Sequence, residues 1–271
     1  MGRGPIWLHE QCEDWDDWDK PASPFPIYGN TYYVGTCGIA AVLVTGEDGH
    51  VLIDSGTEGG AEIVLTNIRT LGFDPGDVKL LLNSHEHFDH VGGMARMQAA
   101  TGAEVVSSEI GVYVMTSGKD HPDDPQAGMH EPMARITRGQ PFDHGTAPAL
   151  LERFGMTPLV TPGHTPGAMS WSWVSCQGAD CRTIVYADSM SPVSSDAYRF
   201  SDHPDYVAAY RGGIARIAAA ECDILLTPHP SASKMVERSA TGSFEGGVSC
   251  EDYAAAVGRR LDNRLAKEAA E

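Results

Sequence analysis

Five potential metal ligands occupy six positions of the segment "LLLNSHEHFDHVGG", residues 80–93. His85 and His87 are two positions apart, so an extended backbone places both imidazoles on one side and Glu86 on the other. Asp89 and His90 follow where the chain is expected to turn into a helix, which lets neighbouring side chains point to different ligands. Imidazole and carboxylate together suit zinc better than magnesium or calcium, which prefer oxygen ligands. We therefore expect a zinc site here, with Glu86 pointing away from it.

Two later histidines also lie where a strand is expected to end. His164 stands between two Pro-Gly pairs in "VTPGHTPGAMS", and His229 follows the apolar run of "ILLTPHPSAS". Loops at the ends of strands are common positions for functional side chains. With these two, the chain offers five histidines and Asp89, enough for two zinc ions with three protein ligands each. Three ligands leave an open position, which is typical of catalytic rather than structural zinc.

The elements that position these residues can be predicted from the hydrophobic pattern. Segments rich in Val, Ile, Tyr and Thr predict strands at 30–36, 39–46, 50–56, 78–85, 103–109, 156–164, 168–175, 182–189 and 222–230. Helical spacing is found at 59–72, 92–102, 204–221 and 250–271. Strands in meanders with helices between them predict an α/β (α+β) fold. We expect a four-layer αβ/βα sandwich, with two mixed β-sheets packed face to face and helices outside.

We expect one domain over residues 1–271. It would carry an N-terminal arm at 1–30 and a polar, proline-rich loop at 117–148. Loops of that length are usually functional, and we expect this one at the site.

Composition excludes some classes of partner. Hydrophobic residues make up 42% of the 271 residues, and the formal net charge is −18. An excess of negative charge disfavours binding to nucleic acid and to anionic lipid, which need clustered Lys and Arg. No apolar run approaches the ~20 residues of a membrane span. We therefore expect neither nucleic acid nor membrane as a partner.

Six cysteines at wide spacing, none in a Cys-x-x-Cys pair, favour three disulfides and an oxidising compartment, with reduced core thiols as the alternative. The first residues lack the pattern of a signal peptide. We expect a periplasmic or secreted protein whose signal peptide is absent from this sequence.

The motifs "HEHFDH", "GHTPG" and "TPHPSAS", in this order, resemble the metallo-β-lactamase superfamily. "YADSMS", "CDILLTPHP" and a later cysteine before the final helix resemble the β-lactamases of class B, third subclass. The resemblance covers nearly the whole chain. It implies a zinc-dependent β-lactamase of antibiotic resistance, which hydrolyses the amide bond of β-lactam antibiotics with a hydroxide that bridges two zinc ions. The partner would be a small-molecule β-lactam, and we expect a monomer.

The resemblance also implies a ligand set. Zn1 would take His85, His87 and His164, and Zn2 would take Asp89, His90 and His229. Asp89 would in addition orient the hydroxide.

Further residues are implied around the metals. Gln126 would donate a hydrogen bond to the developing oxyanion, and Ser189 and Ser191 would bind the substrate carboxylate. For each of the three, an ordinary loop residue is the alternative. Asp188 would turn away from the metals and leave Ser189 at the site, although a bridging Asp188, as in the thioester hydrolases of this fold, stays open.

Disulfides and the N-terminal arm complete the expectations. The resemblance pairs Cys222 with Cys250 at the last helix. Cys176 and Cys181 would then close a hairpin tip, and Cys12 and Cys37 would tie the arm to the first sheet. The arm carries three tryptophans, Trp7, Trp15 and Trp18. They would either form a wall of the pocket or cap the sandwich, and for most of them we favour the cap.

Other activities share this fold. The main alternatives are a glyoxalase II-type thioester hydrolase and a lactonase, while the negative charge disfavours a nuclease. A diiron redox protein would need more carboxylate ligands. A zinc-binding protein without catalysis is a further alternative, which the open coordination positions argue against.

Overall fold

The computed structural model describes residues 5–130 and 132–270 and contains two mixed β-sheets. The larger sheet has seven strands in chain order: β1 (Phe25–Tyr28), β2 (Thr31–Tyr33), β3 (Val42–Val44), β4 (His50–Ile53), β5 (Val78–Leu82), β6 (Glu104–Ser107) and β7 (Gln140–Pro141). Pairing is antiparallel from β1 to β4 and parallel from β4 to β7. The parallel strands therefore place their carboxyl ends at one edge of this sheet.

The smaller sheet has the order β11-β10-β9-β8. Its strands are β8 (Thr157–Val160), β9 (Met169–Gln177), β10 (Asp180–Tyr186) and β11 (Ile224–Leu226). The β9–β10 hairpin is its longest pair, and β11 runs parallel to β10.

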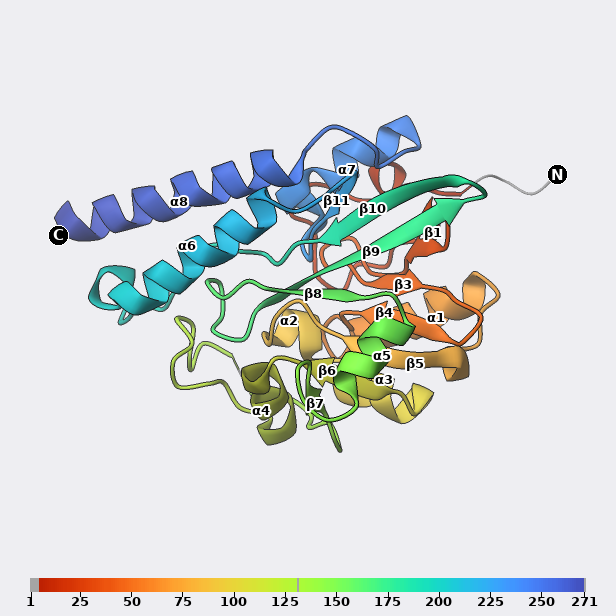
Figure 1. Cartoon of the computed structure of the whole chain (residues 1–271), viewed down its shortest axis with the longest axis horizontal. Helices are drawn as coiled ribbons and strands as arrows, with labels where there is room; N and C mark the ends of the chain where they lie inside the picture. The colour runs from red at the N-terminus through yellow and green to blue at the C-terminus, as the bar shows by residue number, and fades with distance from the viewer. Residues whose placement is uncertain (1–4, 131, 271) are drawn as a thin grey trace.

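Helices lie outside the sheets (Figure 1). The first half of the chain contributes α1 (Gly60–Thr70), α2 (Phe88–Val91), α3 (Met94–Thr101), α4 (Glu109–Ser117) and α5 (Ala147–Arg153). The second half contributes α6 (Pro204–Ala218), α7 (Met235–Arg238) and α8 (Cys250–Ala270). Short 3₁₀ turns link these elements: η1 (Leu8–Glu10), η2 (Pro75–Asp77), η3 (Phe200–Asp202), η4 (Pro230–Ser233) and η5 (Ser239–Thr241).

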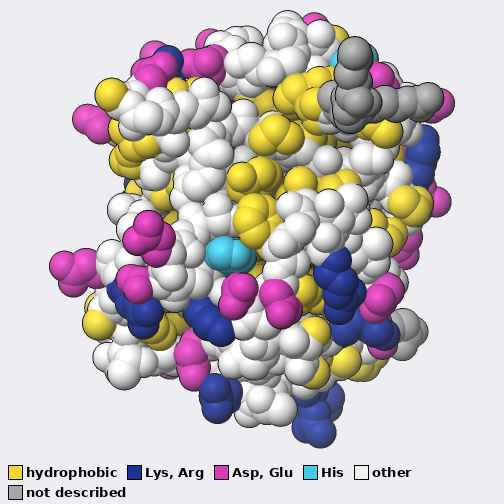
Figure 2. Space-filling model, turned by 90° about the vertical axis from the view of Figure 1, so that its right-hand side faces the viewer, with side chains coloured by type: hydrophobic (Ala, Val, Ile, Leu, Met, Phe, Trp, Pro, Cys, Tyr) yellow, Lys and Arg dark blue, Asp and Glu magenta, His cyan; other side chains and the backbone are white. Residues whose placement is uncertain are grey.

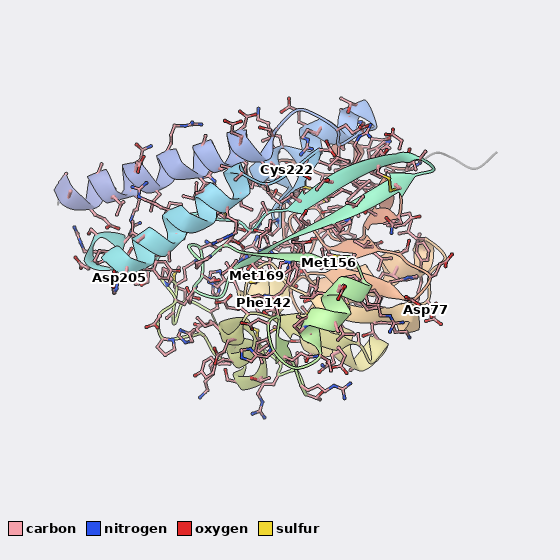
Figure 3. All side chains as sticks on the ribbon, viewed as in Figure 1. Asp77, Phe142, Met156, Met169, Asp205 and Cys222 are labelled. Carbon is pink, nitrogen blue, oxygen red and sulfur yellow. A yellow bond between two sulfur atoms is a disulfide. The ribbon has the colours of Figure 1, made fainter. Side chains whose placement is uncertain are left out.

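Three hydrophobic cores separate the four layers. One lies between the sheets and includes Met156 and Met169, which Figure 3 labels in the middle of the molecule. A second joins the outer face of the larger sheet to α1, α3 and α4, and a third joins the smaller sheet to α6 and α8. The predicted four-layer sandwich of two mixed sheets is confirmed.

The ends of the predicted loop at 117–148 are wrong, because the chain forms regular structure there. β7 pairs with β6, and α5 begins at Ala147. α4, which the hydrophobic pattern left unassigned, ends at Ser117. Its boundaries do carry sequence signals: the Ser108 side chain accepts a hydrogen bond from Gly111 N, and Gly118 adopts a left-handed conformation. The predicted arm at 1–30 likewise contains β1.

Three disulfides link Cys12 to Cys37, Cys176 to Cys181 and Cys222 to Cys250, which are the expected pairs. Figure 3 labels Cys222 below α8.

The surface carries charges of both signs. On the side seen in Figure 2, hydrophobic side chains gather along the middle of the face, and acidic and basic groups surround them. Among the described residues, no helix has the length and hydropathy needed to cross a membrane.

Candidate metal centre

The candidate ligands leave the ends of strands from both sheets. His85 and His87 follow the end of β5 at Leu82, and His87 is the residue before the first turn of α2. Asp89 and His90 lie within α2, and the turn of the helix brings the ring centroid of His90 within 4.1 Å of that of His85. The smaller sheet supplies His164 after β8 and His229 after β11.

One group of three imidazoles lies within coordinating reach of a single ion. One ring nitrogen from each of His85, His87 and His164 lies within 4.8 Å of the other two. All three side chains are buried. The Nε2 atom of His85 has no hydrogen-bond partner among the described residues, which is unusual for a buried nitrogen and fits a metal ligand.

A second group adjoins the first. Ligand atoms of His85, Asp89 and His90 also lie within 4.8 Å of one another. His229 joins this group, because its Nε2 lies 3.3 Å from Asp89 Oδ2 and 3.4 Å from His90 Nε2. The predicted ligands thus come together as two adjacent sets, and both fit a metal ion that takes imidazole and carboxylate ligands.

The other ring nitrogen of each histidine lies within 3.3 Å of a protein oxygen, although His90 Nδ1 and Asp188 Oδ1 form no hydrogen bond among the described residues. Such contacts fix the orientation of a metal-binding imidazole and raise its basicity. The contacts are His85 Nδ1 to Asp188 Oδ1 (2.8 Å), His87 Nε2 to Asp124 Oδ2 (3.0 Å), His164 Nδ1 to the Ser191 carbonyl oxygen (2.9 Å), His90 Nδ1 to Asp54 Oδ2 (3.3 Å) and His229 Nδ1 to the Gly38 carbonyl oxygen (3.3 Å).

The surroundings favour the protonation states that metal binding needs at His85, His164 and Asp89. At His87 and His90 desolvation acts to lower the pKa, but nearby aspartates outweigh it and raise the pKa, that of His90 to about 10. Desolvation, with the other histidines nearby, holds the pKa of His85 and of His164 well below the usual range, so both are neutral at pH 7. For Asp89, burial acts to raise the pKa, but His90 and His229 outweigh it and hold that pKa well below its ordinary value. Asp89 is therefore a carboxylate.

Asp54 and Asp124 are positioning residues that the sequence patterns did not identify. Asp54 follows β4 and has a left-handed backbone, with φ of 61°. It accepts hydrogen bonds from Ser84 N (2.6 Å), Ser84 Oγ (2.8 Å) and Tyr186 OH (2.8 Å) while it faces His90. An aspartate directly after a buried strand, in "LIDSG", was the available signal.

Asp188 and Glu86 both point away from the metal-facing atoms. Asp188 is fully buried, faces the outer nitrogen of His85 and accepts from Met190 N (3.0 Å). Glu86 accepts from Thr165 Oγ1 (2.7 Å) and Gly167 N (2.9 Å), and burial raises its pKa to about 7. Neither carboxylate belongs to the two ligand groups of the described residues.

A pocket of about 350 Å³ opens over the ligands. Its lining comprises Trp15, Trp18, His87, Asp89, Gln126, His130, His164, Ser189, Ser191, Val193, His229, Ala232 and Arg260. Among the described residues, Gln126 Nε2 and Ser189 Oγ are buried polar atoms without a hydrogen-bond partner, so both remain able to bind a ligand. Ser191 is already engaged, since its Oγ lies 3.0 Å from His164 Nδ1. His130, which the sequence analysis did not single out, lies beside His87 with 5.6 Å between ring centroids.

The expectation that most of the arm's tryptophans cap the sandwich is wrong for two of the three. Trp7 does cap the core, with its ring 5.1 Å from that of Phe25. Trp15 and Trp18 instead line the pocket, 69% and 40% exposed, with ring centroids 6.0 and 6.4 Å from that of His229. The Cys12–Cys37 disulfide directs the arm past this histidine, and Trp15 N donates to Ser231 Oγ there (2.7 Å).

Comparison with known proteins agrees with this geometry. The family model of the metallo-beta-lactamase superfamily matches residues 34–177. The structure of the MIM-2 metallo-beta-lactamase is 50% identical, with 98% of this chain and 100% of that chain covered and a TM-score of 0.87. MEM-A1, a subclass B3 metallo-beta-lactamase from a soil metagenome library, is 38% identical, with 94% and 99% covered and a TM-score of 0.86.

Curated relatives match over shorter stretches. The N-acyl homoserine lactonase AttM of Rhizobium radiobacter is 33% identical over 108 residues, which is 38% of this chain and 38% of the lactonase. The chain therefore spans well under two thirds of the length of that relative. The family match over more than half of the sequence, together with the full-length structural matches, identifies the chain as a member of the metallo-β-lactamase superfamily.

Proposed function

We propose that the protein is a dizinc β-lactamase that hydrolyses the amide bond of β-lactam antibiotics. The observation that carries this proposal is the pair of adjacent ligand groups at the base of one pocket, with a protein oxygen close to the outer nitrogen of each imidazole. Similarity to β-lactamases over the full chain supports the substrate class. In this proposal His85, His87 and His164 hold one ion, and a second ion is held by Asp89, His90 and His229.

Bound zinc would supply Lewis acidity and a water of lowered pKa, so that a nucleophile is present at neutral pH. The chain itself would orient the substrate. Gln126 Nε2 has no hydrogen-bond partner among the described residues and is available to donate to the oxygen on which negative charge develops. Ser189 Oγ is a second free donor, suited to the substrate carboxylate, whereas Ser191 acts mainly through His164. Trp15 and Trp18 would pack against apolar parts of the substrate.

Three disulfides support an oxidising location, the periplasm or the cell exterior. There the protein would meet β-lactams before they reach their targets, which is the physical basis for a role in antibiotic resistance.

The test is hydrolysis of nitrocefin by the protein reconstituted with zinc, with metal content measured on the same sample. We expect turnover at two zinc ions per chain and its loss after chelation. Turnover of lactoylglutathione or of an acyl homoserine lactone, without turnover of any penicillin, cephalosporin or carbapenem, would replace this proposal with the thioester hydrolase or the lactonase. The second of these is the stronger alternative, because the lactonase is among the curated relatives.

A further inference from the structure

Helix α8 is attached at two points to the segment that follows β10. Tyr253 OH donates to the carbonyl oxygens of Asp188 (2.8 Å) and Ser189 (2.7 Å). Further along α8, Arg264 donates to Ser194 Oγ (2.8 Å). Arg260 lies two helical turns after Tyr253 and one turn before Arg264, so all three share one face of α8. Arg260 is therefore carried alongside residues 190–193, and it lines the pocket with Ser191 and Val193.

Among the described residues, the charge of Arg260 has no partner. Two other arginines on these helices do have one: Arg264 contacts Glu268 (2.6 Å), and Arg211 contacts Asp262 (2.6 Å). Arg259, like Arg260, has none among the described residues, but it lies outside the pocket lining. Arg260 is exposed and makes no hydrogen bond or ion pair with any other residue in the ranges 5–130 and 132–270. Among the described residues that line the pocket it is the only lysine or arginine, in a chain whose net charge is −18.

The guanidinium of Arg260 lies close enough to the segment that follows β10 to act on Tyr253, which is hydrogen-bonded to that segment. Burial raises the pKa of Tyr253 above its usual value, and the positive charge of Arg260 partly offsets that rise. Tyr253 in turn holds the backbone of Ser189, whose buried Oγ has no partner among the described residues. A cation and a free hydroxyl donor thus lie on the same side of the pocket, and together they suit a planar anion such as a carboxylate.

We propose that Arg260 is a specificity-determining residue that binds the anionic group of the substrate and thereby selects anionic over neutral ligands of the metal centre. This inference rests on the proposed function for its substrate, a β-lactam with a carboxylate, but its binding test does not require hydrolysis. Arg260 acts on affinity, because it lies on α8 and not among the groups that face the reacting bond.

The kinetic test compares three variants with the zinc-loaded parent. R260A raises KM for an anionic β-lactam about threefold and R260E about tenfold, both with little change in kcat. R259E is the matched control, since it changes the net charge equally from the neighbouring position on α8, about 100° around the helix and outside the pocket lining. The difference between R260E and R259E shrinks as NaCl is raised towards 1 M, because salt screens exposed charges.

The binding test uses two thiols that differ in charge. 2-Mercaptoethanesulfonate carries an anionic group, and 2-mercaptoethanol has a neutral hydroxyl in its place, while both thiols are soft ligands for zinc. By calorimetry on the zinc-loaded protein, R260E weakens binding of the sulfonate about tenfold and leaves binding of the alcohol unchanged.

Equal KM values for R260E and R259E, or equal weakening of both thiols by R260E, would overturn the assignment. Thermal midpoints equal to that of the parent exclude a folding defect, and α8 keeps its anchors at Tyr253 and Arg264 in each variant. If R260E weakens binding of the sulfonate alone but the parent hydrolyses no β-lactam, the proposed function fails and the anion site at Arg260 stands.

Discussion

The two halves of the sandwich contribute to the metal centre in different ways. The half built on the larger sheet holds four of the proposed ligands in one six-residue segment, at the junction of β5 and α2. The half built on the smaller sheet supplies single histidines, His164 and His229, from two separate loops. The first contribution is set by local backbone geometry, whereas the second depends on how the two sheets dock. A metal site of this kind is therefore completed only when both halves have folded and packed.

The largest effect is expected from Asp89, the only carboxylate among the proposed ligands. Asp89→Ala should lower kcat about 10³-fold or more, because it removes both a ligand and the negative charge next to His90. Metal analysis should show loss of one ion while the ion at His85, His87 and His164 is retained. Asp123→Ala, which changes an 80% exposed side chain, serves as the control. Unchanged turnover in Asp89→Ala would refute its role.

The two single histidines allow the halves to be separated. His164→Ala should weaken the site of His85 and His87, and His229→Ala should weaken the site of Asp89 and His90. In each variant, affinity for the affected ion should fall at least about 100-fold. This loss is larger than that expected from changing a residue that only orients a ligand. Competition with a chromophoric chelator measures both sites. The same site weakened in both variants would mean that the ligand sets are divided differently. His144→Ala is the matched control, since that side chain is 70% exposed.

Two disulfides of the half built on the smaller sheet should differ in their effect on stability, with no effect on metal binding. The Cys222–Cys250 bond closes a separation of 28 residues and Cys176–Cys181 one of 5. Replacing both cysteines of a pair by alanine should cost about 3–4 kcal/mol for the first and about 2 kcal/mol for the second, since loop-closure entropy grows with loop length. Denaturant unfolding of the zinc-loaded protein gives both values. Equal losses of unfolding free energy would indicate that native packing, and not chain entropy, determines how much each disulfide stabilises the protein.

The smallest effects should come from the aspartates that lie against ligands, one across the halves and one within a half. Asp188, from the smaller sheet, faces His85, and Asp54, from the larger sheet, faces His90. Asp188→Asn and Asp54→Asn should each lower affinity for one ion by about 10–100-fold, which is about 1.4–2.7 kcal/mol. Zinc titration of the two variants measures this. If Asp188→Asn weakened only the ion at Asp89, His90 and His229, Asp188 would act through a residue other than His85.

The sequence allowed the layers and the set of candidate ligands to be predicted, because both are recorded locally. Alternating and helical patterns mark the strands and helices, and the two-residue spacing of His85 and His87 already places Glu86 on the opposite side. The contacts that orient the ligands were not predictable in the same way. Asp124 is 37 positions from His87 and meets it only after the loop has packed, and no local pattern records that contact.

The arm shows the same limit. Trp15 and Trp18 are large apolar side chains of the kind that cap a core. They reach the pocket instead because a disulfide and the left-handed backbone of Trp15, with φ of 54°, direct the chain there. Their destination depends on partners far away in sequence, such as Ser231.

The path of this arm has a consequence for how the protein can diversify. Trp15 and Trp18 form one wall of the pocket, yet they belong to a short segment that contributes none of the proposed metal ligands. The Cys12–Cys37 disulfide and the hydrogen bond from Trp15 N to Ser231 Oγ hold this segment in place. Mutations there can alter which molecules enter the pocket while the proposed metal ligands stay in place. If the proposed activity holds, substrate preference can therefore change through this segment alone, at little risk to the chemistry.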